Sequence, residues 1–121
     1  MLPRDKPIHL LGIGDVESIL VGARLGVDTF DSAFPTRLGR HGTALTRSGR
    51  VKVGQAQYRD DYGPLDPACA GFVSTNYSRA YLHHLWRANE PVVHGLLTLH
   101  NIQFMMDYMA NLRMRILLDE V

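Results

Sequence analysis

A carboxylate followed by two guanidinium groups is the part of this chain whose residue types could do chemistry. The short apolar run Val27 to Phe30 has the length of a buried β-strand, and Asp31 follows it directly. Arg37 and Arg40 come a few residues later. A carboxylate at the carboxyl end of a strand, with cations just beyond it, suits chemistry on an anionic substrate. An acid that only caps a surface loop would give the same pattern.

The segment that carries these two arginines is predicted to be a loop, because Pro35 and Gly39 interrupt regular structure. It belongs to a longer stretch, Ser32 to Arg59, that contains no Asp or Glu. Such a basic stretch indicates a polyanionic partner, although a solvated positive face would have the same composition. Its cations are Arg37, Arg40, Arg47, Arg50, Lys52 and Arg59.

The residues before Asp31 predict a strand, a helix and a second strand. Residues 8–14 read as a strand that ends in a glycine loop, Asp15 can cap the following helix, and Gly26 would stop it. This order predicts a right-handed βαβ unit. Backbone amides of the glycine loop could hold a phosphate, and a plain tight turn is the alternative.

The second half of the chain predicts a hairpin and two helices. Residues 43–46 and 50–53 flank a Ser-Gly turn, which is a hairpin signal. A helix is expected to start at residues 76–78 and to reach about Asn89, with Ala80, Tyr81, Leu85 and Ala88 facing inward. Apolar residues recur at helical spacing from His100 onwards and predict a long final helix.

Several long motifs in this sequence resemble one family. The segment FDSAFPTRLGRHGTA, residues 30–44, resembles the active-site segment of the tRNA-guanine transglycosylases, also called queuine tRNA-ribosyltransferases. The similarity continues through YRDD (58–61), PLDP (64–67), YSRAYLHHL (77–85) and LTLHN (97–101), and it covers nearly all 121 residues.

The resemblance implies a fold. Members of this family are (β/α)₈ barrels, which typically need about 250 residues. The chain resembles only the carboxyl-terminal part of the family, so the expected fold class is α/β, a partial TIM barrel of the last two βα units. Within the single expected domain 1–121, residues 42–90 would form an inserted hairpin and zinc-type subdomain.

The resemblance also implies a function, which is base exchange in queuosine biosynthesis. A family member replaces the wobble guanine of a tRNA anticodon with queuine or a queuine precursor through a covalent Asp-ribosyl intermediate. Asp31 matches the nucleophile. The implied partners are tRNA, a guanine- or queuine-type base, and a second subunit in a homodimer or heterodimer. The positions that match RNA-binding residues are Gly12, Ile13, Gly14, Asp15, Val16, Glu17, Ser18, Thr36, Arg37, Leu38, Gly39 and Arg40.

Zinc is expected from the resemblance, yet the ligand pattern is degenerate. The family's Cys-x-Cys-x-x-Cys and distant His correspond here to Cys69, Gly71, Ser74 and His100. Glycine offers no side-chain ligand, and a neutral serine hydroxyl is a poor one for zinc. Two of the four ligands, Cys69 and His100, remain, so zinc binding is doubtful. Cys69 is then expected to be a small buried apolar residue. His83 and His84 are expected to be helix-packing histidines, with replacement metal ligands as the alternative.

Two functions stay open at this point. The chain is either a catalytic piece of a pentosyltransferase or a non-catalytic or truncated relative that binds tRNA or a partner subunit; whether the isolated chain is an enzyme is undecided. A single cysteine, Cys69, fits a reducing compartment. No apolar run reaches the roughly 18 residues of a membrane helix. The expected location is therefore cytoplasmic, with no membrane partner.

Overall fold

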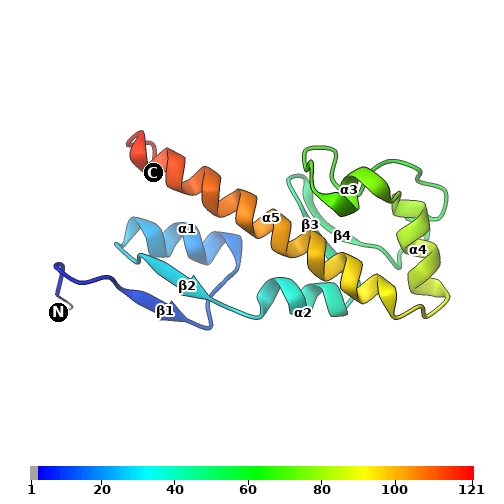
Figure 1. Ribbon diagram of the computed structural model, residues 1–121, viewed down its shortest axis with the longest axis horizontal. Coiled ribbons are helices and arrows are strands. Elements are labelled where there is room, and N and C mark those ends of the chain that lie inside the picture. Colours follow the sequence, from blue (N-terminus) through cyan, green and yellow to red (C-terminus); the bar gives the residue numbers. More distant parts are fainter. Residues whose placement is uncertain (1–2) are drawn as a thin grey trace. The chain divides into compact units, whose positions relative to one another are not determined.

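The computed structural model describes residues 3–121, and the chain divides into two compact units. One unit comprises Met1–Phe34 and Asp107–Val121, and the other comprises Pro35–Met106. The long helix α5 (Val92–Leu117) contributes to both units (Figure 1). The fold is mixed α/β, and its described strands form two separate two-stranded sheets. Within residues 3–121, no helix is long and apolar enough to span a membrane.

The first unit is built on a parallel strand pair. Strands β1 (His9–Leu11) and β2 (Thr29–Asp31) pair so that Leu11 lies opposite Asp31, and helix α1 (Val16–Arg24) connects them. Asp15 caps α1, because its carboxylate accepts a hydrogen bond from the Ser18 amide at 2.9 Å. The predicted strand, helix and strand are confirmed, but β2 runs through Asp31 instead of ending before it.

Close packing holds α1 against this strand pair. A Cβ added at Gly22 would lie 2.8 Å from the Phe30 ring, so only glycine allows the helix to approach this strand so closely. Ile19 of α1 and Leu112 of α5 are buried. The Tyr108 hydroxyl donates to the Val16 carbonyl at 3.1 Å, which ties the last turns of α5 to the start of α1.

The segment predicted to be a loop around Pro35 and Gly39 is instead a helix, α2 (Phe34–Arg40). Proline is compatible with the first turn of a helix, where its missing N–H is not needed. A Cβ at Gly39 would lie 2.7 Å from the Thr98 amide nitrogen. Gly39 therefore permits α2 to pack on the backbone of α5, and it does not end the helix.

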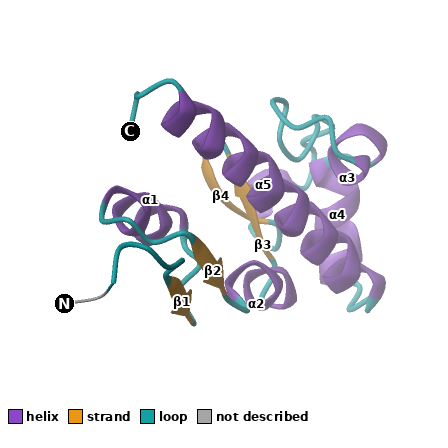
Figure 2. Ribbon diagram, turned by 60° about the vertical axis from the view of Figure 1, so that its left-hand side comes forward, coloured by secondary structure: helices purple, strands orange, loops and turns teal. Residues whose placement is uncertain are grey.

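The predicted hairpin is confirmed. Strands β3 (Thr43–Thr46) and β4 (Gly49–Lys52) pair antiparallel, with Thr46 opposite Gly49 (Figure 2). Gly49 has a φ of 121°, a conformation that favours glycine at the end of this tight turn. The short 3₁₀ helix η1 (Ala56–Tyr58) follows the hairpin.

Helices α3 (Phe72–Asn76) and α4 (Arg79–Arg87) complete the second unit. Ala80 and Leu85 are buried as predicted, whereas Tyr81 and Ala88 are exposed. The difference arises because α4 turns Leu82 inward, which is fully buried, and because Ala88 lies beyond the last helical turn. The apolar core of this unit consists of Ala44, Val51, Val53, Leu65, Val73, Leu82, Leu85, Val93 and Leu97.

An ion pair between Arg79 and Asp61 joins the start of α4 to the loop before it. We expect this pair to make the stability of the second unit depend on pH in the acid range. Arg79 donates to Asp61 at 3.1 Å, and this bond, with a second from the Gly63 amide, lowers the pKa of Asp61 below its usual 3.8. The pair therefore stabilises the fold at pH values above 3.8, and its contribution is lost as the pH falls and Asp61 takes up a proton. Asp61→Asn should flatten the acid side of a plot of Tm against pH. If the Tm of the two proteins fell equally as the pH decreased, the Arg79–Asp61 pair would not be the cause of the acid sensitivity.

Candidate functional site

Asp31 lies where parallel strands present functional groups. It is the last residue of β2, and its partner Leu11 is the last residue of β1, so both strands end at the same edge. The Asp31 side chain is exposed to solvent. The position at the end of the strand agrees with the sequence analysis, and the role of Asp31 as nucleophile stays a prediction.

The glycine loop after β1 lies against the chain just beyond Asp31. A Cβ added at Gly14 would overlap the side chain of Ser32. Gly12 has a φ of 73°, and only residues without a Cβ adopt this conformation easily. The structure therefore places Gly14, one of the predicted RNA-binding residues, beside Ser32, the residue that follows the predicted nucleophile.

The other acid of β2's segment, Asp28, has a structural role. Its carboxylate accepts a hydrogen bond from the Ile8 amide at 2.7 Å, and its own amide donates to the Ile8 carbonyl at 2.9 Å. These two bonds join the beginnings of the two strands. Asp28 therefore lies at the opposite end of β2 from Asp31.

Arg37 and Arg40 belong to the second unit and are described within it. Both side chains are exposed on the last turn of α2, and their spacing of three residues places them on one side of the helix. Thr36 and Leu38 are half-buried, and Gly39 is buried against α5. α2 can thus offer two guanidinium groups to an anion from a helix whose other side is fixed.

Sequence reasoning assigned no role to Asn101, which positions α2. Its side-chain amide donates to the Pro35 carbonyl at 3.0 Å and to the Thr43 carbonyl at 2.9 Å, and its side-chain oxygen accepts from the Leu45 amide at 2.8 Å. Asn101 is fully buried. One side chain on α5 therefore holds both the start of α2 and strand β3. No local signal distinguishes Asn101, because other polar residues, Thr98, His100 and Gln103, stand beside it in the same helix.

The four positions of the expected zinc site form two contacting pairs in the second unit. Cys69 and Ser74 are buried, and the Cys69 sulfur accepts a hydrogen bond from the Gly71 amide at 3.4 Å. A Cβ at Gly71 would lie 3.2 Å from that sulfur. The Ser74 hydroxyl lies 3.4 Å from Nδ1 of His100. Cys69 therefore contacts Gly71, and Ser74 contacts His100.

The residues at these positions do not fit a zinc ion. Within residues 3–121, no group of three or more His, Cys, Asp or Glu side chains is arranged to hold a metal. Asp66 is close in sequence, but its carboxylate already accepts hydrogen bonds from the amides of Arg47 and Ala68. Cys69 and His100 alone give two of the four ligands that a structural zinc site needs.

His100 is held in a defined state. Its Nε2 lies 2.7 Å from the Leu45 carbonyl oxygen, which can only accept, so Nε2 carries the proton. Burial lowers the pKa of His100 and outweighs the opposing effects of this hydrogen bond and of the Asp66 charge. The ring is therefore neutral at physiological pH, and Nδ1 is a hydrogen-bond acceptor that faces Ser74.

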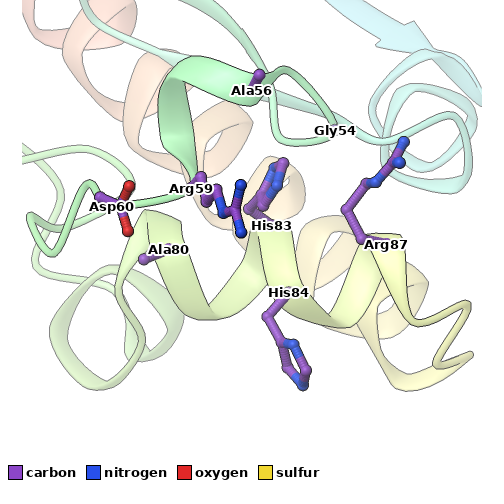
Figure 3. A pocket seen from close by; sticks show the side chains of 8 residues that line it. All are labelled: Gly54, Ala56, Arg59, Asp60, Ala80, His83, His84 and Arg87. Carbon is purple, nitrogen blue, oxygen red and sulfur yellow. The ribbon is translucent and has the colours of Figure 1, made fainter.

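A pocket of about 640 Å³ lies between the η1 region and α4 (Figure 3). None of the predicted catalytic, RNA-binding or zinc-site residues lines it. His83 is buried there and its Nδ1 contacts the Val53 carbonyl at 2.7 Å, which confirms that it is a packing histidine. The same prediction is wrong for His84, because it leaves α4 in another direction and is exposed. The lining residues are Gly54, Ala56, Arg59, Asp60, Ala80, His83, His84 and Arg87.

Comparison with known proteins identifies close similarity along the whole chain. The family model described as queuine tRNA-ribosyltransferase matches residues 1–121. The chain is 43% identical over 121 residues to the queuine tRNA-ribosyltransferase of Chlamydia felis, covering 99% of this chain and 32% of that protein. It is 44% identical to the one of Lactococcus lactis subsp. cremoris strain SK11 and 41% identical to the one of Acetivibrio thermocellus, and each match covers 100% of this chain and 32% of the relative. The chain therefore spans about a third of the length of the curated relatives it matches.

Proposed function

Because the chain belongs to the queuine tRNA-ribosyltransferase family, we propose that it supplies the nucleophile and part of the RNA-binding surface of a tRNA base-exchange enzyme. The observation that carries this proposal is the position of Asp31. It is an exposed carboxylate at the carboxyl end of β2, and Gly14, in the loop between β1 and α1, lies beside the residue that follows it. Active sites of β/α barrels lie at this end of their strands.

The proposed reaction consists of two displacements at the anomeric carbon of one ribose. The Asp31 carboxylate attacks this carbon, a C–O bond forms, and the bond to the wobble guanine breaks. Guanine leaves with the bonding electrons and takes up a proton. Queuine or a queuine precursor then loses a proton, attacks the same carbon through nitrogen, and releases Asp31. Two successive displacements retain the configuration of the ribose, and the target base must first leave the anticodon stack.

RNA would be held by two surfaces in this proposal. Arg37 and Arg40 suit the contact because a planar guanidinium can bind a phosphate or a base edge through two hydrogen bonds. Residues 12–18, which form the loop after β1 and the first turn of α1, would contact the RNA next to the reacting ribose. Thr36, Leu38 and Gly39 would contribute through the shape and backbone of α2.

The parallel β1–α1–β2 arrangement supports the wider architecture that we propose. It is the repeating unit of a (β/α)₈ barrel, of which this chain would form the last two units. Residues 42–90 would be the inserted subdomain of that barrel. A homodimeric or heterodimeric assembly and a cytoplasmic location complete the proposal.

A base-exchange assay tests the proposed function. The chain would be studied alone and as a chimaera in which it replaces the matched segment of the Lactococcus lactis relative. Transfer of labelled guanine into a tRNA with a wobble guanine is the expected result for the chimaera. If the chimaera is folded and binds tRNA but transfers no label, the catalytic proposal is wrong.

The alternative function is a non-catalytic module that binds tRNA or a partner subunit. It is favoured by the degenerate metal positions. In that case the chain would bind tRNA without exchanging a base.

Both functions predict that Arg37 and Arg40 contribute to tRNA affinity. Each substitution to alanine should weaken binding and reduce the slope of log affinity against log salt concentration by about 1, because one phosphate contact is lost. Binding measured by fluorescence anisotropy over a salt series gives both quantities. Arg113→Ala on α5 is a matched control that removes an exposed arginine outside α2. An equal effect of all three substitutions would show that only net charge matters.

A further inference from the structure

We infer that the second unit, Pro35–Met106, is closed by a metal-free hydrogen-bonded junction at the place where its relatives' ligand pattern predicts zinc. The junction links strand β3, the segment from Asp66 to Ser74 in helix α3, and helix α5. It includes Ser74 and His100, which occupy two of the four positions expected to bind zinc. This inference does not depend on the catalytic proposal.

The junction is a continuous path of hydrogen bonds. His100 donates from Nε2 to the Leu45 carbonyl at 2.7 Å, and its Nδ1 lies 3.4 Å from the Ser74 hydroxyl. Ser74 in turn accepts from the Asp66 amide at 3.2 Å. The Asp66 carboxylate accepts from the Arg47 amide at 3.1 Å, which returns the path to the β3–β4 turn.

Every group on this path finds a partner of the right kind. The proton on Nε2 of His100 leaves Nδ1 as an acceptor, so the Ser74 hydroxyl donates to it and its oxygen remains free to accept from Asp66. His100, Ser74 and Asp66 are all buried, with exposed fractions of 2%, 5% and 2%. Buried polar groups that are fully hydrogen-bonded stabilise a unique arrangement without a bound ion.

The orientation of His100 explains why serine can take this place. A histidine that binds zinc through one nitrogen usually donates from the other to a carbonyl or carboxylate, which fixes the ring. His100 keeps that donation, to Leu45, while its other nitrogen faces a hydroxyl. The Ser74 proton therefore occupies the position on Nδ1 where a metal would bind.

Gly71 lets the loop close without a ligand. Its amide donates to the Cys69 sulfur, and a Cβ there would lie 2.8 Å from Cγ of Gln103. The sulfur thus has a hydrogen-bond partner in the backbone. The absence of a side chain at Gly71 allows α5 to approach the loop closely.

Metal analysis of the purified chain tests the inference directly. Protein made in zinc-supplemented medium should contain far less than one zinc per chain by plasma mass spectrometry. Its Tm should be the same with and without EDTA. One zinc per chain, or a Tm that EDTA lowers, would overturn the inference.

Two single substitutions distinguish a hydrogen-bonded junction from a zinc site. Ser74→Ala removes the central link and should lower the Tm by roughly 5 °C, equally with and without EDTA. Cys69→Ser keeps an acceptor for the Gly71 amide and should change the Tm less. In a zinc site the order would be reversed, because the thiolate is a ligand and the neutral hydroxyl is not. A larger loss for Cys69→Ser would therefore contradict the inference.

Restoring the ligand pattern gives the complementary result. The triple variant Gly71→Cys, Ser74→Cys, Gln103→Ala supplies three thiols beside His100, and its third substitution removes the Cγ atom that a Cβ at residue 71 would meet. It should take up one zinc per chain, and its Tm should then fall in EDTA, unlike that of the original chain. A folded triple variant that takes up no zinc would show that these positions cannot form one site, and the inference would fail.

Discussion

Replacing Asp31 with asparagine is expected to abolish base exchange while leaving the fold intact. Asparagine has the same shape as aspartate but lacks the charge needed to attack the anomeric carbon. The loss of exchange should be at least about 10³-fold, as expected when a covalent nucleophile is removed. The side chain is exposed, so its substitution should change Tm little. The measurement is transfer of labelled guanine to tRNA by the chimaera with and without the substitution.

Asp28→Asn is the matched control for this prediction. Asp28 lies on the same strand segment, and its carboxylate accepts the Ile8 amide, a bond that an asparagine oxygen can still accept. Exchange should be retained in this variant, with at most a small decrease in Tm. A denaturing gel adds a second readout, because the covalent tRNA adduct should form with Asp28→Asn and be absent with Asp31→Asn. Exchange retained by Asp31→Asn would exclude Asp31 as the nucleophile.

Local sequence signals predicted the elements whose determinants are close together in the chain. The cap at Asp15, the β1–α1–β2 order and the β3–β4 hairpin each depend on a few neighbouring residues, and the structure confirms all three. The position of Asp31 at a strand end followed from the same reasoning. These features required no knowledge of distant contacts.

The signals that failed depend on residues far apart in the sequence. Pro35 and Gly39 read locally as loop residues, yet Gly39 packs on the Thr98 backbone and the segment is helical. The metal-free junction likewise needs Leu45 and His100 to meet, which no local pattern reveals. Tertiary packing overrides local propensity at such positions. The same reason explains why Asn101 was missed.

Asn101→Ala is expected to cause the largest loss of stability among the substitutions considered. It would leave the Leu45 amide and the carbonyls of Pro35 and Thr43 without their side-chain partner in a buried environment. The free energy of unfolding should fall by on the order of 3 kcal/mol, because several buried backbone groups lose a hydrogen bond at once. Denaturant titration followed by circular dichroism measures this change. Hydrogen exchange at Leu45 should also become faster.

Asn111→Ala isolates the cause, since Asn111 lies on the same helix with an exposed side chain. This control should leave the free energy of unfolding nearly unchanged, because alanine favours a helix and no buried group loses a partner. If Asn101→Ala behaved like the control, its three hydrogen bonds would contribute little, and α2 would be held by Gly39 packing alone. If the predicted loss is observed, a folded fraction of Asn101→Ala should also bind tRNA more weakly, because Asn101 fixes the start of the helix that carries Arg37 and Arg40.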